Sequence, residues 1–262
     1  MSIATEITLT SEITVRRIQT MGGDAMVVAA AKVSTNGEEA AQFATAENAN
    51  ANAGLINYLM AHRHGTPFEH SAMTFFVRAP IFVWREWHRH RIGFSYNEES
   101  ARYKPLAPVF WIPRRDRKMC PEEGWKPGRP KFKTLDEALN RPDLSADEAK
   151  TMADRWYEAE IARYRESYST CYRNYQASIA DGIAMEVARC QLPVAIYSSC
   201  WVTCNPRSLM SFVSLRVQDD AAKFMSYPQA ETDETARAAE QFLADGWPIT
   251  YASFVKNGRV AP

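Results

Sequence analysis

The chain has 262 residues, 46% of them hydrophobic and 24% charged, so it can bury a sizeable core as one large domain or two small ones. Lys+Arg and Asp+Glu balance at 31 each, which gives no support to a nucleic-acid-binding or membrane-binding protein and requires any anion site to be local. The sequence shows no secretory signal and no apolar run near the roughly 18 residues of a membrane span. The five cysteines include no CxxC pair, so we expect a cytoplasmic protein without a disulfide framework.

The first part of the chain alternates predicted strands with predicted helices. Alternating β-branched residues predict a strand over Glu12–Gln19, and an apolar run predicts a buried helix over Gly22–Ser34. A second helix over Asn50–His64 breaks at a Gly-Thr-Pro turn, and a strand follows over Ser71–Ala79. We expect a helix over Pro80–Arg91, with proline at its first position, where the missing N–H costs nothing.

The second part is mostly helical in pattern. Residues 113–145 are polar and proline-rich and predict a long excursion or lid, whose basic residues favour a solvated face. Helices are expected over 146–181, 182–193, 205–218 and 229–244 and near the C-terminus, with one strand over 195–204. Asn205 is a good N-cap, and Pro206 suits the first position of its helix. Strands and helices mix without regular βαβ alternation, which favours an α+β fold.

Polar groups concentrate between His62 and Arg102. All five histidines lie between His62 and His90. Successive helical residues point about 100° apart, so Arg89, His90 and Arg91 cannot all face one small ligand from a regular helix. Either the helix ends there, or the three side chains serve different neighbours across an interface. The simplest alternative is a basic helix C-terminus that complements the helix dipole.

The segment after Gly93 has no apolar period. Its hydroxyl and amide side chains, with Arg102, are suited to a phosphate and a sugar, although an ordinary capped loop is the alternative. His64, Thr66, Glu69 and His70 surround a turn that could bind a cofactor; their spacing matches no familiar zinc pattern, which leaves a histidine metal site as a weaker alternative.

Two arginines of the helix predicted over 205–218 are further candidate functional residues. Arg207 would lie in the first turn of its helix, where a cation opposes the dipole, and a residue placed against its local preference hints at function. Arg216 follows on a largely apolar helix, where an arginine snorkelling at the helix end is the alternative.

Linked motifs then give a family resemblance. T-P-F-E-H, R-H-R, S-x-N-E-x-S-x-R-Y, A-R-x-x-L-P and N-x-R-S-L-M-x-F-x-x-L-R follow one another in this order, from about Val33 to the C-terminus. In this order they resemble the flavin-dependent thymidylate synthases. That family needs no cysteine nucleophile, and no cysteine here has a convincing base beside it.

The resemblance implies an α+β fold with a mixed sheet and long helices, as one domain over 1–262, and active sites between the subunits of a homotetramer. It implies FAD as cofactor, NADPH and 5,10-methylenetetrahydrofolate as co-substrates, and no metal. By motif position, the flavin-side residues are Ser34, His64, Thr66, Glu69, Arg89, His90, Arg91, Glu98, Asn205, Arg207 and Ser211. The nucleotide-side residues are Glu86, Trp87, His88, Arg89, Glu98, Glu99, Ser100, Ala101, Arg102, Arg189 and Arg216.

Within this set, Arg189 matches the phosphate-binding arginine. Arg216 matches the catalytic arginine that polarises the uracil ring and favours its N3-deprotonated form. The implied reaction is reductive methylation of dUMP to dTMP. Methylation of a related nucleotide such as UMP, and a non-catalytic flavin- or nucleotide-binding protein, are the alternatives.

Three departures from the family pattern are visible. The stretch between Arg91 and Ser100 is longer by a residue, and the residues after Arg216 include Asp219 and Asp220 where many members have histidine. Glu86 replaces the glutamine of some relatives, and an acid there fits only if it binds a sugar or an arginine.

Overall fold

The computed structural model describes residues 6–262, which fall into two compact units. The sheet unit comprises residues 13–79, 83–98 and 199–262. The α6 unit, named for its long helix α6 (Ala146–Ala180), comprises residues 6–12, 80–82 and 99–198. A single domain over 1–262 stays a prediction, whereas the mixture of helices and strands is confirmed.

A four-stranded sheet forms the base of the sheet unit. Its order is β2 (Thr14–Met21), β3 (Ala72–Pro80), β8 (Tyr197–Cys204) and β4 (Phe94–Glu98). β2 pairs antiparallel with β3, and β4 pairs antiparallel with β8. Side chains of β3 alternate between buried and half-buried, as expected for a strand with one face on a core. The strands predicted over 12–19, 71–79 and 195–204 are therefore confirmed within a few residues.

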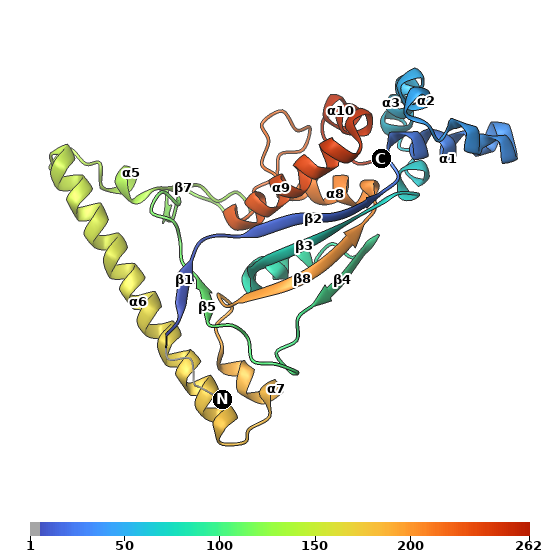
Figure 1. The fold of residues 1–262 in the computed structure, drawn as a ribbon. Coiled ribbons are helices and arrows are strands. Elements are labelled where there is room, and N and C mark those ends of the chain that lie inside the picture. Colours follow the sequence, from blue (N-terminus) through green and yellow to red (C-terminus); the bar gives the residue numbers. More distant parts are fainter. Residues whose placement is uncertain (1–5) are drawn as a thin grey trace. The chain divides into compact units, whose positions relative to one another are not determined.

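Helices cover this sheet, as Figure 1 shows for α9 running beside β2. The phenyl rings of Phe75 in β3 and Phe242 in α9 stack with centroids 6.1 Å apart. The helices of this unit are α1 (Asp24–Asn36), α2 (Ala46–Ala51), α3 (Ala53–Ala61), α4 (Ile81–Trp87), α8 (Pro206–Arg216), α9 (Ala230–Gly246) and α10 (Pro248–Lys256), with 3-10 turns η1 (Gly37–Phe43) and η2 (Thr66–Glu69). The helix predicted over 50–64 corresponds to the end of α2 and to α3, which are separated at Asn52.

Two predictions around the polar cluster are wrong in detail. Pro80 ends β3 instead of beginning a helix, and α4 stops at Trp87. The Tyr96 hydroxyl lies 2.8 Å from the carbonyl oxygens of both Trp87 and His90, so it satisfies acceptors that a longer helix would have used. The segment after Gly93, for which no regular element was predicted, begins with strand β4, because Phe94 to Glu98 pair with Cys204 to Cys200.

The α6 unit is built on one long amphipathic helix. α6 begins with a capping box in which Ser145 and Glu148 exchange hydrogen bonds, and it confirms the helix predicted over 146–181. Phe110 of β5 (Val109–Trp111) packs against Tyr168 and Tyr172 of α6, and β5 pairs in parallel with β1 (Thr8–Thr10). Both strands are too short for periodicity to predict.

The remaining elements of this unit are short. The helix predicted over 182–193 is reduced to α7 (Met185–Ala188) and the 3-10 turn η3 (Arg189–Gln191). The excursion over 113–145 holds β6 (Cys120–Pro121), β7 (Phe132–Lys133) and α5 (Leu135–Leu139). Across residues 6–262, no helix combines the length and the apolar character that crossing a membrane requires.

Candidate active site

Arg216, the last residue of α8, lies at the centre of a polar cluster in the sheet unit. Its Nη1 is 2.6 Å from Glu86 Oε2, and its Nε donates to His90 Nε2 at 3.0 Å. The Arg216 side chain is only 19% exposed, so it is held in place and partly shielded from water. Glu86 therefore binds an arginine, which is one of the two conditions under which an acid fits this position.

The hydrogen bond from Arg216 requires His90 to be neutral at Nε2. Burial, followed by the charge of Arg216, lowers the pKa of His90 from 6.5 to about 4. His90 also packs edge-to-face against Phe212, with ring centroids 4.9 Å apart. At neutral pH, His90 thus orients the Arg216 guanidinium without adding a second positive charge.

The turn after α4 spreads the basic residues apart. Because α4 ends at Trp87, Arg89 and Arg91 leave the helix and are exposed, whereas His90 points inward to Arg216. The sequence did not single out Tyr96, whose hydroxyl fixes this turn and whose ring packs against His88. Burial raises the pKa of Tyr96, so the hydroxyl keeps its proton. Phe94 and Tyr96 are two residues apart, a spacing that places both rings on one face of a strand, and this spacing could have indicated that Tyr96 packs inward.

Trp87 occupies a different environment from its neighbours. Its side chain is fully buried, and its indole N–H donates to Thr235 Oγ1 at 2.9 Å. Its ring also packs against Phe212, with centroids 4.3 Å apart. Trp87 therefore anchors the end of α4 in the core, and only its backbone faces the polar turn.

A second cluster in the sheet unit gathers flavin-side positions around Arg207. The Nη1 of Arg207 lies 2.5 Å from Glu69 Oε1, and its Nε donates to the carbonyl oxygen of Pro262 at 2.8 Å. Its side chain remains 43% exposed. Ser211 is exposed one turn further along α8, on the same face as Arg207. The structure therefore joins motifs that are 138 positions apart in sequence.

Glycines make room for these contacts. A Cβ at Gly65 would lie 2.4 Å from the Arg207 guanidinium carbon. A Cβ at Gly93, where φ is +69°, would lie 2.1 Å from Ser208 Oγ and 2.8 Å from Asn205 Nδ2. Gly93 thus lets the turn before β4 approach the start of α8, a role that the sequence did not reveal.

The other flavin-side candidates are less closely joined. Asn205 is confirmed as the N-cap of α8, since its Oδ1 accepts from Ser208 N at 2.8 Å. His64 is exposed just before η2, and Thr66 is exposed at the first position of η2. Ser34 is exposed on α1, and its hydroxyl donates to the Ala31 carbonyl at 3.0 Å. Guanidinium, hydroxyl and imidazole donors in accessible positions suit the pyrophosphate and polar ring edges of a flavin nucleotide.

The α6 unit contributes a separate pair of arginines. Arg102 Nε donates to Glu186 Oε2 at 2.9 Å, and Arg189 Nε donates to the Glu186 carbonyl oxygen at 3.4 Å. Arg102 and Arg189 are both exposed, and Ser100 Oγ accepts from Arg102 N at 3.3 Å. Two guanidinium groups at one residue are suited to a phosphate. Glu186, which the sequence did not single out, contacts Arg102 through its carboxylate and Arg189 through its carbonyl oxygen.

The nucleotide-side residues predicted from the sequence are thus divided between the units. Glu86, Trp87, His88, Arg89, Glu98 and Arg216 lie in the sheet unit, and Glu99, Ser100, Ala101, Arg102 and Arg189 in the α6 unit. Glu99 pairs with Lys104 at 2.8 Å, and Ala101 is buried in the core beside Leu106.

The two cysteines of β8 are buried. Desolvation raises the pKa of Cys200 to about 12 and also raises the pKa of Cys204. Both thiols are therefore protonated at neutral pH, which suits small core side chains better than nucleophiles. Among residues 6–262, no three His, Cys, Asp or Glu side chains are grouped so as to hold a metal ion.

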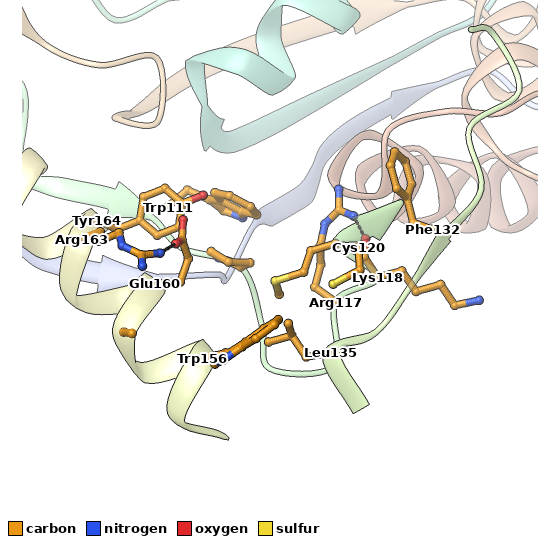
Figure 2. Close-up of a pocket in the computed structure, with 13 residues that line it drawn as sticks. Trp111, Arg117, Lys118, Cys120, Phe132, Leu135, Trp156, Glu160, Arg163 and Tyr164 are labelled. Carbon is orange, nitrogen blue, oxygen red and sulfur yellow. Dashed lines mark hydrogen bonds and ion pairs between the residues drawn. The ribbon is translucent and has the colours of Figure 1, made fainter. Parts of the chain in front are cut away.

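A cavity of about 620 Å³ lies in the α6 unit, away from every predicted site residue in that unit. Figure 2 shows Trp156 of α6 on one side of this cavity and Arg117, Cys120 and Phe132 of the excursion on the other. Arg117 and Lys118, expected on a solvated face, line it. The cavity shares no residue with the Arg102–Arg189 pair, so we do not assign the nucleotide to it.

Comparisons with known proteins agree with the motifs. Residues 17–248 match the family model described as thymidylate synthase complementing protein. A flavin-dependent thymidylate synthase of Streptomyces coelicolor is 45% identical over 257 residues, covering 98% of this chain and 96% of that protein. One from Streptomyces avermitilis is 44% identical over 253 residues, covering 96% and 94%.

Solved structures also match the chain over nearly its whole length. The UMP/dUMP methylase PolB from Streptomyces cacaoi, bound with 5-Br dUMP, matches with a TM-score of 0.82 at 37% identity, covering 98% of this chain and 100% of that chain. The same methylase bound with 5-Br UMP matches with a TM-score of 0.80 at 36% identity and the same coverage. The chain therefore belongs to the family of flavin-dependent thymidylate synthases.

Proposed function

We propose that this protein catalyses the reductive C5-methylation of dUMP to dTMP, with methylenetetrahydrofolate as carbon donor. FAD, reduced by NADPH, supplies the hydride. The observation that carries the proposal is the Arg216 cluster, in which a shielded guanidinium is oriented by Glu86 and a neutral His90. Such a preorganised cation stabilises negative charge that develops on the pyrimidine ring, because no solvent must reorganise during the reaction.

The other residues bind and orient. Arg102 and Arg189 hold the nucleotide phosphate, since two exposed guanidinium groups converge at Glu186. Arg207 binds the flavin together with Ser211, His64 and Thr66. All four side chains are accessible and belong to the flavin-side motif positions. Arg89 and Arg91 bind anionic groups at an interface between subunits of a homotetramer. Their exposure beside Ile92, which is 91% exposed, supports this placement.

The first experiment is an absorbance spectrum of the purified protein, followed by anaerobic addition of NADPH with and without dUMP. We expect visible flavin bands that bleach faster when the nucleotide is present. A colourless protein that does not take up added FAD would contradict the proposal and favour a non-catalytic relative. The presence of both Arg189 and Arg216 speaks against that alternative.

A second candidate substrate is UMP. The methylase PolB is described as acting on UMP and dUMP, and it matches this chain over nearly its whole length. Steady-state kinetics with both nucleotides separate the two. We expect a higher kcat/KM for dUMP, and equal or better turnover of UMP would overturn the assignment to dUMP.

A further inference from the structure

Arg259 is a buried cation in an unfavourable backbone conformation. It lies just after α10, its side chain is 5% exposed, and its φ is 59°. Removing a cation from water and holding a residue with a long side chain in a left-handed conformation both cost free energy. A residue held against two such penalties must be fixed by its surroundings, and such positions concentrate where structure serves function.

Two carboxylates fix Arg259. Its Nη1 lies 3.2 Å from Asp219 Oδ2, and its Nη2 lies 2.7 Å from Glu240 Oε1. Asp219 also accepts from Ala221 N at 2.8 Å through its other oxygen, and Glu240 accepts from the Tyr251 hydroxyl at 2.9 Å. Asp219, one of the two acids that follow Arg216 as a departure from the family pattern, is therefore a partner of Arg259.

The residues that follow Arg259 reach the flavin-side cluster. Pro262 is buried, and its carbonyl oxygen accepts from Arg207 Nε at 2.8 Å. Glu69 holds Nη1 of the same guanidinium, and Gly65 lies so close that a methyl group would not fit. The Arg207 guanidinium is thus held by the carboxylate of Glu69 and the backbone oxygen of Pro262. The backbone of Gly65 lies directly beside it.

We propose that Arg259 is a positioning residue: by fixing residues 260–262 it places the Pro262 carbonyl that orients Arg207 toward the flavin. The inference rests on the proposed function, in which Arg207 contacts FAD. The ion pairs connect the loop after α8, which carries Asp219, with the first turn of α8, which carries Arg207. Arg259 itself does not touch the cofactor.

The test is a double-mutant cycle on FAD affinity with Arg259→Asn and Arg207→Ala. Asparagine tolerates the left-handed conformation, so this substitution removes the ion pairs and keeps the backbone preference. We expect Arg259→Asn alone to weaken FAD binding by about five- to twenty-fold, a size typical of coupled residues. We expect it to cause no further loss once Arg207 is alanine. Affinity is measured by FAD titration of the apoprotein, below the unfolding temperature of every variant.

The double-mutant cycle distinguishes a failure of the proposed role of Arg207 in FAD binding from a failure of the positioning role of Arg259. If Arg207→Ala binds FAD normally, the role of Arg207 in the proposed function fails. If Arg207→Ala weakens binding while Arg259→Asn does not, or if the two losses add fully, the positioning role fails. Arg141→Gln is the matched control, because Arg141 pairs with Asp143 at 3.5 Å on an exposed surface of the α6 unit. It should leave FAD affinity unchanged.

Discussion

Arg216 is held by two partners of different kinds, the carboxylate of Glu86 and the neutral imidazole of His90. The Glu86 carboxylate attracts the Arg216 cation, whereas a protonated His90 would repel it. The combination leaves a guanidinium whose direction is fixed. The orientation of the Arg216 guanidinium therefore depends on the protonation state of His90.

Replacing Arg216 with alanine should separate flavin binding from chemistry. In the proposed function the cation acts on the nucleotide, so Arg216→Ala should retain FAD and lose methylation, with kcat lowered by about 100- to 1,000-fold, as for other preorganised charge stabilisers. Flavin absorbance and dTMP formation are measured on the same sample. Normal turnover in this variant would contradict the assigned role.

The buried state of His90 predicts a pH dependence of stability. The pKa of His90 is about 4 in the folded chain and near 6.5 when unfolded, so between these values the unfolded chain binds more protons. The free energy of unfolding should therefore fall as the pH drops from 6.5 toward 4. Urea unfolding at several pH values measures it, and His90→Gln should show a smaller fall. Identical pH profiles for the two proteins would rule out this contribution.

Helix α8 organises the site at the scale of elements. It carries Arg207 and Ser211 on one face near its start and Arg216 at its end, and buried Leu209 and Phe212 fix it to the core. The turn of η2 meets its first residues through Gly65 and Glu69, and the turn after α4 meets its last through His90. One helix therefore joins the flavin-side and base-side clusters.

Gly65→Ala should change flavin binding more than stability. The added methyl group meets the flexible end of Arg207, so the guanidinium moves while the backbone stays in place. We expect FAD affinity to fall by about ten-fold and the free energy of unfolding to change by less than about 1 kcal/mol. Gly54→Ala, in α3 with nothing within 4 Å of the new Cβ, is the matched control. Equal FAD affinity in both variants would contradict the steric argument.

At the scale of the whole molecule, the candidate residues belong to two units. The Arg102–Arg189 pair lies in the α6 unit, and the Arg216 cluster lies in the sheet unit. Within the proposed homotetramer, one site can take its phosphate-binding arginines from one subunit and Arg216 from another. A site of this kind makes activity depend on assembly.

Mixing two inactive variants tests this arrangement. Arg189→Ala and Arg216→Ala are each expected to be inactive alone, and co-refolding them should restore activity at about a quarter of the sites if the two arginines come from different subunits. Activity of the mixture is compared with each variant refolded alone, and sedimentation gives the oligomer size. An inactive mixture of full tetramers would show that both arginines come from one chain.

The sequence by itself determined the family, the α+β class and most element positions, because linked motifs, N-caps such as Asn205 and apolar periodicity are local properties. The helix predicted over 80–91 was wrong at Pro80 and at its end, and β4 was not predicted, because tertiary hydrogen bonds from Tyr96 and pairing with β8 override local preference there. Only the tertiary structure decided the partners of the functional arginines: Glu86 and His90 with Arg216, Glu186 with Arg102, and the C-terminal residues with Arg207. The physical reason is that such contacts join positions as far as 138 residues apart, and no local pattern encodes which distant side chain will satisfy a given charge.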